Sequence, residues 1–276
     1  MSQPAIAPQP FAAPWINGTQ CATDPLIQVQ QYDADTFVLR QSLCTNFEAP
    51  FMYLLFGTDK VLLQDTGNGG IPIQATVQSI IDQWLLAHGQ ASIQLIVSHS
   101  HGHGDHTKGD PQFVGKPNTT VVGTSQSAVA AFFSLTSWPL GSTAYDLGGG
   151  RIVDVLPLPG HQAAHIALYD RRTSLVFTGD SLYPGRLYIS DFPVYRASMQ
   201  RLADFLADKP IAHVLGTHIE MSSVPGVDFP LGSLVHPNEH RLQLRRWHLL
   251  ELVHALDDMV GAPFKDVHAD FIVFPL

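Results

Sequence analysis

One run of nine residues, 98–106, constrains this chain most, because it holds four histidines and one aspartate. It directly follows residues 93–97, an apolar stretch that predicts a buried strand. The other positions in the run are serine or glycine, and Gly102 and Gly104 let the backbone turn tightly. A strand that ends in imidazole and carboxylate side chains is well placed to hold zinc or a neighbouring transition metal.

The spacing inside the run suggests which of its candidate ligands bind the same metal ion. His101 and His103 are two residues apart, so on an extended segment they share a face and can bind one ion together. Asp105 and His106 follow where the chain is expected to turn into a helix, and they can point toward a second ion. A solvated histidine tract is the alternative, but tags lie at chain ends and lack an aspartate between the imidazoles.

Further along the chain, three more ligand-type residues occupy the same kind of position. Each lies at the C-terminal end of a short apolar stretch that predicts a strand, and each is close to a glycine. The stretches are residues 152–156, 174–177 and 212–215. The residues that follow them are His161, Asp180 and His218. Such a repetition is difficult to obtain by chance.

The motif His101-x-His103-x-Asp105-His106, with these later residues, resembles the metallo-β-lactamase fold hydrolases over about residues 50–220. Asp65, within residues 61–67, matches an early motif of that family and is expected to hold the loop that carries the ligands. The resemblance implies an α/β fold, the αββα four-layer sandwich. Strands interspersed with helices along the chain agree with such a layered architecture.

The resemblance also implies two divalent metal ions, Zn²⁺ first and Mn²⁺ or Fe as alternatives. An acidic residue at position 180 is typical of thioesterases, lactonases and phosphodiesterases in this family, whereas true β-lactamases carry a different residue there. The implied ligand sets are His101, His103 and His161 for one ion, Asp105, His106 and His218 for the other, and Asp180 as the bridge.

Two metal ions close together are expected to activate a water molecule for hydrolysis. They lower the pKa of a bridging water, so the expected nucleophile is a metal-bridging hydroxide, and no serine or cysteine is needed. Asp105 is expected to orient that nucleophile and to pass a proton to the leaving group. Tyr183 lies three residues after Asp180, where the similar N-acyl-homoserine lactonases carry a tyrosine that donates a hydrogen bond to the substrate. A tyrosine packed beneath the loop is the alternative.

These residues predict a hydrolase of a small carbonyl ester, with a lactone ahead of a thioester. Residues 177–182 also look like glyoxalase II, but Arg245 and Arg246 are only unaligned candidates for glutathione-binding residues. A β-lactam hydrolase and a small-molecule phosphodiesterase are the enzymatic alternatives. A di-iron redox protein, similar to the flavodiiron proteins, is the alternative outside the hydrolases, and it would require a flavodoxin partner domain.

The composition of the chain indicates which classes of partner it binds and in which compartment it is expected. The net charge is −9 with only 15 Lys and Arg, and the densest basic segment is residues 241–246, which disfavours nucleic acid. No apolar run is long enough to span a membrane, and residues 1–10 are not typical of a secretory signal. Cys21 and Cys44 are too few for a disulfide framework, so we expect a reduced cytoplasm. The expected partner is a small-molecule substrate, with a homodimer as a possible assembly.

The chain is expected to form one domain, residues 26–276, preceded by an extended arm, residues 1–25. Residues 219–243 are rich in Pro, Gly, Ser and His and start after the last ligand, so they predict a lid or binding loop, with a surface excursion or dimer contact as alternatives. Periodicity predicts helices at residues 74–88, 125–133, 195–206 and 244–260. Strands are predicted at residues 27–30, 36–39, 51–56, 60–63, 120–122 and 271–274.

Overall fold

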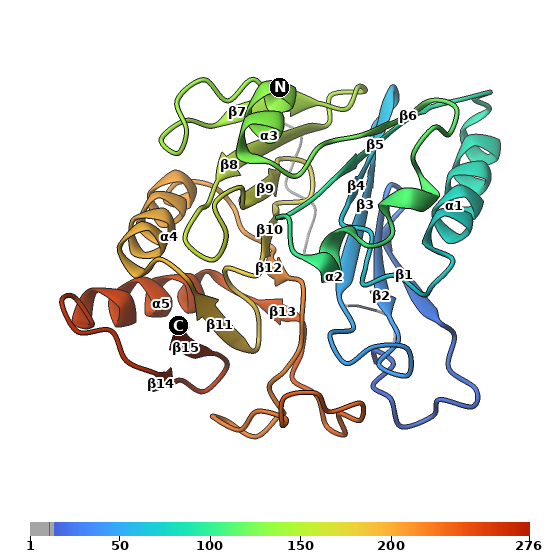
Figure 1. Ribbon diagram of the computed structural model, residues 1–276. Coiled ribbons are helices and arrows are strands. Elements are labelled where there is room, and N and C mark those ends of the chain that lie inside the picture. Colours follow the sequence, from blue (N-terminus) through green and yellow to red (C-terminus); the bar gives the residue numbers. More distant parts are fainter. Residues whose placement is uncertain (1–10, 12–13) are drawn as a thin grey trace.

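The computed structural model describes residue 11 and residues 14–276, and within them two six-stranded sheets face each other (Figure 1). The first sheet follows chain order through β1 (Ile27–Asp33), β2 (Thr36–Gln41), β3 (Phe51–Phe56), β4 (Lys60–Gln64), β5 (Gln94–Ser98) and β6 (Thr119–Val121). The second has the order β13-β12-β10-β9-β8-β7. Its strands are β7 (Thr143–Asp146), β8 (Ile152–Pro157), β9 (Ile166–Asp170), β10 (Leu175–Gly179), β12 (His213–Gly216) and β13 (Gln243–Leu244).

Apolar side chains join these sheets to each other and to helices on their outer faces. Between the sheets, the rings of Tyr53 and Phe177 lie 4.6 Å apart. Helix α1 (Ile73–His88) covers the first sheet, and α4 (Phe192–Leu206) and α5 (Arg246–Asp258) cover the second (Figure 1). The predicted αββα four-layer sandwich is therefore confirmed.

Local signals explain where the helices begin and end. Helix α1 ends at Gly89, whose φ of 64° lies in the left-handed region that glycine adopts without strain. Helix α3 (Gln126–Phe133) begins after Ser125, whose hydroxyl accepts a hydrogen bond from the Ala128 N–H at 3.2 Å. The helices predicted at residues 74–88 and 125–133 are confirmed to within about one residue at each end.

A small third sheet was not predicted as a unit. It has the order β11-β15-β14, with β11 (Arg186–Ile189), β14 (Asp266–Val267) and β15 (Ile272–Pro275). Only β15 was expected, as a closing strand. The partner strand β11 pairs with β15 in parallel from a distant part of the chain, and such a pairing leaves no signal in a single short segment.

A buried arginine ties the two large sheets together. Arg151, just before β8, donates from Nη1 to the carbonyl oxygens of Asp35 and Phe56, at 2.6 and 2.9 Å. Its Nη2 donates to Asp170 Oδ2 at 2.6 Å and to Thr36 Oγ1 at 2.8 Å. Arg151 and Asp170 are both buried, so this charge pair has full hydrogen bonding but almost no contact with water.

The N-terminal segment is fastened to the first sheet. Trp15 packs edge-on against Phe51, with ring centroids 4.9 Å apart, and Arg40 Nη1 donates to the Ile16 carbonyl at 2.7 Å. Residues 1–10 and 12–13 of the expected arm lie outside the described residues.

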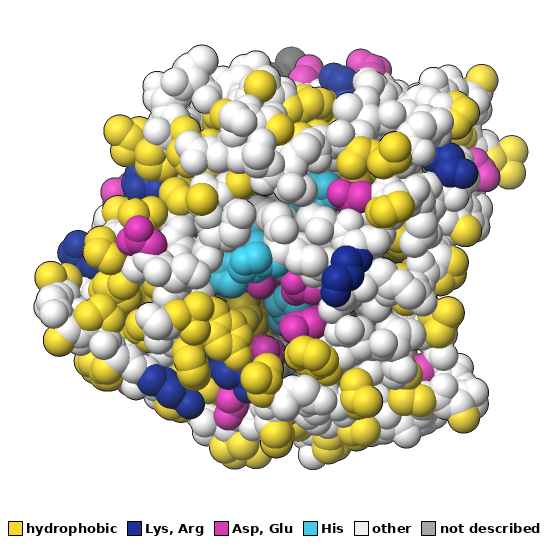
Figure 2. All heavy atoms as spheres, viewed as in Figure 1, with side chains coloured by type: hydrophobic (Ala, Val, Ile, Leu, Met, Phe, Trp, Pro, Cys, Tyr) yellow, Lys and Arg dark blue, Asp and Glu magenta, His cyan; other side chains and the backbone are white. Residues whose placement is uncertain are grey.

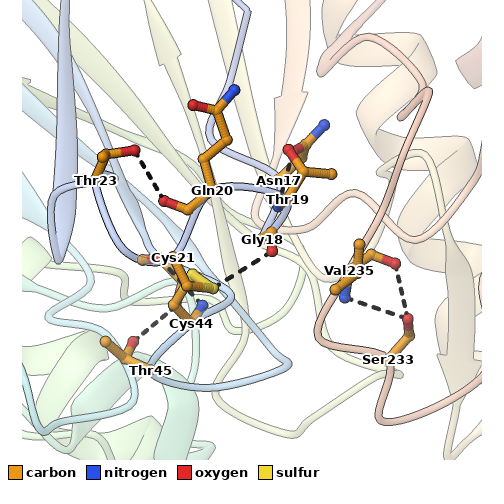
Figure 3. Close-up of a disulfide and its surroundings, with 11 residues drawn as sticks. Asn17, Gly18, Thr19, Gln20, Cys21, Thr23, Cys44, Thr45, Ser233 and Val235 are labelled. Carbon is orange, nitrogen blue, oxygen red and sulfur yellow. Dashed lines mark hydrogen bonds between the residues drawn. A yellow bond between two sulfur atoms is a disulfide. The ribbon is translucent and has the colours of Figure 1, made fainter.

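Cys21 forms a disulfide with Cys44, in the loop between β2 and β3 (Figure 3). The cysteine count predicted no disulfide framework, and this single bond was missed because spacing in the sequence does not show which residues the fold brings together.

The disulfide is expected to stabilise the fold measurably. It closes a loop across a separation of 23 residues, so constraint of the unfolded chain is worth about 3 kcal/mol. Reduction, or the double substitution Cys21→Ser with Cys44→Ser, should lower the free energy of unfolding by up to about that amount in urea titrations. Reductant should leave the double variant unchanged. An unaltered urea midpoint on reduction of the wild-type chain would contradict the expectation.

The segment 219–243 is held against the body by charged contacts. The carboxylate of Glu239 accepts two hydrogen bonds from Arg40, both at 2.6 Å, and Asp228 accepts one from Arg186 Nη1 at 2.7 Å. Isolated bridges join Met221 to Asp228 and Ser222 to Glu239. The segment therefore has a defined path close to the last predicted ligand.

Among the described residues, no helix has both the length and the apolar character that a membrane crossing requires.

Candidate metal centre

The predicted ligands follow the ends of four strands. Those of the first sheet come after β5, where Asp105 and His106 lie on the expected short helix, α2 (Gly104–Thr107), and the others lie on loops after β8, β10 and β12 of the second sheet. Figure 2 shows histidine and acidic side chains gathered in a hollow of the visible face. A glycine shapes one of these loops: Gly160 has a φ of 131°, and a Cβ there would lie 2.3 Å from Tyr195 Cα. Only glycine fits at this position, where the backbone just before His161 passes so close to α4.

The first group of side chains is His101, His103, His161 and Asp180. The Nε2 atom of His161 is 3.2 Å from His101 Nε2 and 3.1 Å from His103 Nδ1, and these last two atoms are 2.9 Å apart. Ligand atoms about 2.0–2.1 Å from one tetrahedral zinc ion lie about 3.3 Å from one another. The three nitrogens are therefore spaced much as a single bound ion requires.

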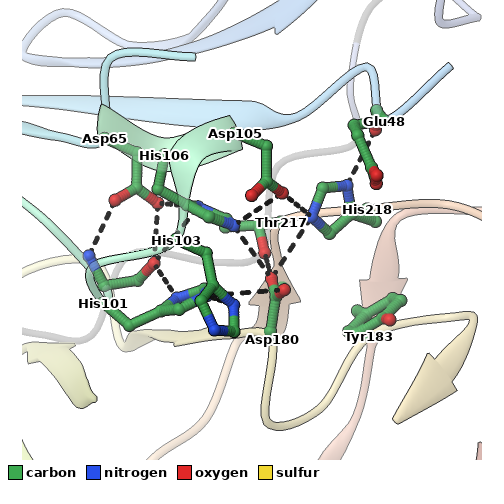
Figure 4. A network of polar contacts seen from close by, with 12 residues as sticks. Glu48, Asp65, His101, His103, Asp105, His106, Asp180, Tyr183, Thr217 and His218 are labelled. Atoms are coloured by element: carbon green, nitrogen blue, oxygen red, sulfur yellow. Dashed lines mark hydrogen bonds and ion pairs between the residues drawn. The ribbon is translucent and has the colours of Figure 1, made fainter. Parts of the chain in front are cut away.

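The second group is Asp105, His106, Asp180 and His218 (Figure 4). The Nε2 atoms of His106 and His218 lie 3.0 and 3.3 Å from Asp105 Oδ2. They lie 3.4 and 3.3 Å from Asp180 Oδ1. The buried His106 Nε2 has no hydrogen-bond partner of proper geometry, so an electron-pair acceptor at this point would satisfy it.

Asp180 offers a different oxygen to each group. Its Oδ2 is 3.7 Å from His101 Nε2 and 3.5 Å from His161 Nε2, while Oδ1 faces the second group. The Thr217 hydroxyl donates a hydrogen bond to Oδ1 and holds the carboxylate in this orientation (Figure 4). One carboxylate is thus placed between two sets of imidazoles.

Hydrogen bonds on the far side of the rings orient them. The Nδ1–H of His161 donates to the Tyr188 carbonyl at 2.7 Å, and the Nδ1–H of His218 donates to the Glu48 carbonyl at 2.8 Å. Because each Nδ1–H is engaged by a carbonyl, Nε2 is the ring nitrogen that faces the centre and can bind a cation there. Sequence reasoning missed Tyr188 and Glu48, because they act through backbone carbonyls, which any residue carries.

Asp65 fastens the histidine-rich loop, in agreement with its expected supporting role. The Ser100 N–H and hydroxyl donate to its two carboxylate oxygens at 2.7 and 2.9 Å, and His106 Nδ1 lies 3.0 Å from Oδ2. His165 accepts a hydrogen bond from the Asp180 N–H at 3.2 Å and stacks on His101. These contacts position the ligands from behind.

Electrostatics in the centre favour a bound cation. Burial opposes ionisation of Asp180, but the imidazoles of His218, His106 and His101 outweigh it and hold its pKa well below its usual range. Burial likewise opposes the charge on His106, yet Asp105, Asp180 and Asp65 raise its pKa well above the usual value. Burial lowers the pKa of His101. The centre therefore combines ionised carboxylates with imidazoles that differ in proton affinity.

These pKa directions predict how metal affinity depends on pH. The pKa values of His106 and His218 are raised, so without a metal both rings keep their protons at neutral pH. A metal ion must displace those protons, so its affinity should increase as the pH rises from about 6 to 8. Zinc calorimetry in buffers of different ionisation enthalpy measures the proton release. Binding without proton release at neutral pH would contradict this prediction.

The expected hydrogen bond from Tyr183 to a substrate stays a prediction, and the structure shows a different partner for its hydroxyl. Its side chain is 2% exposed, and its hydroxyl donates to the carbonyl oxygen of Arg186. A phenol has one proton to donate, so as placed this hydroxyl cannot also hold a substrate oxygen. The ring packs edge-on against His218, with centroids 5.5 Å apart. Tyr183 lies beneath the loop and supports His218.

Comparisons with known proteins agree on one family. The profile of the Metallo-beta-lactamase superfamily matches residues 45–218. A hydroxyacylglutathione hydrolase of Chromohalobacter salexigens is 30% identical over 163 residues, 57% of this chain and 58% of that protein. A stretch of 77 residues, 26% of this chain, is 32% identical to 28% of the acyl-coenzyme A thioesterase MBLAC2 of Gallus gallus.

The chain spans about half the length of the curated hydrolases it matches. Among solved structures, a metallo-beta-lactamase from Pontibacter korlensis superposes with a TM-score of 0.54 at 16% identity, covering 84% of this chain and 99% of that one. At this level of identity the superposition shows a shared fold. The sequence profile and the fold thus point to the same group of proteins.

Proposed function

The chain belongs to the metallo-beta-lactamase superfamily, and from this premise we propose that it is a metal-dependent hydrolase of a small carbonyl ester. The observation that carries the proposal is the placement of Asp180, which offers Oδ2 to one group of imidazoles and Oδ1 to another. A purely structural carboxylate needs one set of partners. Two sets of lone pairs directed at its two oxygens suit a pair of cations.

We propose two divalent ions, one in each group, with zinc first and iron or manganese as alternatives. The donors support this order, because imidazole suits zinc and iron, whereas manganese prefers oxygen ligands. A bound metal pair would supply Lewis acidity that ionises a water molecule and polarises a substrate carbonyl. The seven ligand residues proposed are His101, His103, Asp105, His106, His161, Asp180 and His218.

Asp105 is the residue proposed to move a proton. Burial opposes its ionisation, but His106 and His218 hold its pKa well below the usual range, so the carboxylate is ionised at neutral pH. Its side chain is 17% exposed, and Oδ2 faces both imidazoles. An ionised carboxylate at the open side of the centre can accept a proton from water and return it to a leaving group.

Two observations support an acyl thioester as the substrate ahead of a lactone. The named relatives are a hydroxyacylglutathione hydrolase and an acyl-coenzyme A thioesterase, and both names denote hydrolysis of thioesters. The preference for lactones depended on Tyr183, whose hydroxyl is engaged by the Arg186 carbonyl. Lactones remain the second candidate, since the same chemistry opens either bond.

Tyr183→Phe tests this ranking directly. With its hydroxyl bound to a backbone carbonyl, we expect a loss of stability of about 1 kcal/mol and a change in lactone or thioester turnover below about threefold. A hydroxyl that held the developing oxyanion would be worth about 3 kcal/mol, more than a hundredfold in rate. Steady-state kinetics of the metal-loaded variant separate the two outcomes, and the larger loss would restore the lactonase hypothesis.

The proposed function is tested by metal analysis joined to a substrate panel. Purified protein should contain about two metal ions per chain and hydrolyse acyl thioesters faster than lactones, phosphodiesters or a chromogenic cephalosporin. His103→Ala should lower both metal content and turnover. His254→Ala, at a histidine whose side chain is 81% exposed, is the matched control and should change neither. Wild-type protein that neither binds these metals nor hydrolyses any of the substrates would refute the proposal.

The disulfide indicates the compartment in which the protein matures, and the net charge indicates which classes of partner it can bind. The Cys21–Cys44 bond favours maturation in an oxidising compartment, contrary to the cytoplasm expected from the cysteine count. We propose that the partner is a small molecule and that nucleic acid is not bound, given the net charge of −9. The homodimer stays a prediction that sedimentation equilibrium would test.

A further inference from the structure

A cavity of about 590 Å³ lies on the side of the second sheet where segment 219–243 meets the start of α5. None of the described residues that line it belongs to either candidate ligand group. Its volume lies within the range of small-molecule sites, about 300–1,000 Å³. The side chains that matter below are Arg241, Arg245, Trp247, Glu239, His240 and Asp270.

The two carboxylates of this cavity already have partners. Glu239 accepts both of its short hydrogen bonds from Arg40, a buried residue outside the cavity lining. Asp270 pairs through Oδ1 with His240 Nε2 at 2.8 Å and through Oδ2 with His248 Nε2 at 3.2 Å. Neither acidic group is therefore directed at the arginines of the lining.

Arg241 and Arg245 are the available charges. Both are exposed, and among the described residues neither guanidinium forms an ion pair. Two unpaired guanidinium groups on one cavity form a site suited to a phosphate or carboxylate.

An aromatic ring lies beside these charges. Trp247 is 50% exposed, and it stacks on His248 with centroids 3.5 Å apart and planes inclined by 24°. The imidazole thus braces an indole that also lines the cavity. A braced, half-exposed indole next to guanidinium groups can stack with a planar ring while the arginines hold an attached anion.

We propose that this cavity binds a small anion that carries an aromatic ring, of which a nucleoside monophosphate is the simplest example. Arg241 and Arg245 contact the phosphate, and Trp247 stacks on the base. The site is separate from the candidate metal centre, and the proposal does not depend on the hydrolase function.

The probe is AMP, titrated by calorimetry and by tryptophan fluorescence, with inorganic phosphate and adenosine as component probes. Every titration is repeated in His103→Ala, so that binding at the metal centre is recognised. We expect a Kd for AMP below about 1 mM in both backgrounds, and weaker binding of each component. Arg241→Ala with Arg245→Ala should weaken AMP binding about tenfold or more.

Two single variants make the test specific. Trp247→Leu should weaken AMP binding and leave inorganic phosphate unaffected, because it removes the ring and no charge. Arg196→Ala removes an exposed arginine paired with Asp257 outside the cavity lining, and it should bind AMP like the wild type. The proposal is overturned if AMP does not bind, if the double arginine variant binds it unchanged, or if His103→Ala abolishes binding. Equal affinities for phosphate and AMP would overturn the aromatic part.

Discussion

Asp180→Ala is expected to lower the metal content of the purified protein to well below one ion per chain and to reduce turnover at least about a thousandfold, about 4 kcal/mol of transition-state stabilisation. The effect is large because one carboxylate serves both groups. Its Oδ2 is 3.5 Å from His161 Nε2, and its Oδ1 is 3.3 Å from His218 Nε2. Without it, each of the two proposed cations would lose a ligand, and no carboxylate would connect the two groups.

The control for Asp180→Ala is Asp82→Ala, which removes an exposed carboxylate of α1 from the same chain. It should keep both the metal and the activity. Mass spectrometry of bound metals and circular dichroism distinguish loss of the metal centre from loss of the fold. If Asp180→Ala retained a full metal complement and wild-type rates, Asp180 would not bridge the two groups and the proposed centre would be wrong.

Arg151→Met is expected to lower the free energy of unfolding by about 3–5 kcal/mol. The substitution leaves Asp170, which is fully buried, without the guanidinium that donates to Oδ2 at 2.6 Å. It also leaves the carbonyl oxygens of Asp35 and Phe56, which belong to the opposite half of the sandwich, without the hydrogen-bond donor that Arg151 supplies. An unpaired charge and unpaired carbonyls inside the protein both oppose folding.

Urea titration of Arg151→Met beside Arg196→Met measures this effect. The side chains of Arg196 and Asp257 are 42% and 45% exposed, so breaking that ion pair should change the free energy of unfolding by less than about 0.5 kcal/mol. A loss below about 1 kcal/mol in Arg151→Met would show that water enters and replaces its hydrogen bonds. The buried arginine would then not tie the two sheets together.

Much of the fold was predictable because its signals are local. The periodicity that predicted helices at residues 74–88 and 125–133 spans only a few turns of chain, and both helices formed where they were expected. The small sheet of β11, β15 and β14 was not predicted as a unit. Its parallel pairing joins Arg186 to Ile272, and no short window of sequence contains both strands.

The candidate ligands could be named from the sequence for a similar reason, whereas the groups that orient them could not. Residue types such as His161 and Asp180, set after short apolar strands, mark a ligand regardless of where the strands lie. The groups that orient them include the Tyr188 and Glu48 carbonyls, and a backbone carbonyl has no identity in a sequence. The same limit applies to Tyr183, because the sequence does not state which way a hydroxyl points.

By itself, the sequence determined the alternation of strands and helices and the residues able to bind a metal. Both depend on side-chain chemistry and on spacings of a few residues. Only the tertiary structure decided that Asp180 lies between two groups of imidazoles, that Cys21 pairs with Cys44, and that the Tyr183 hydroxyl turns to a backbone carbonyl. These outcomes depend on distances between remote segments, and packing of the two sheets sets those distances.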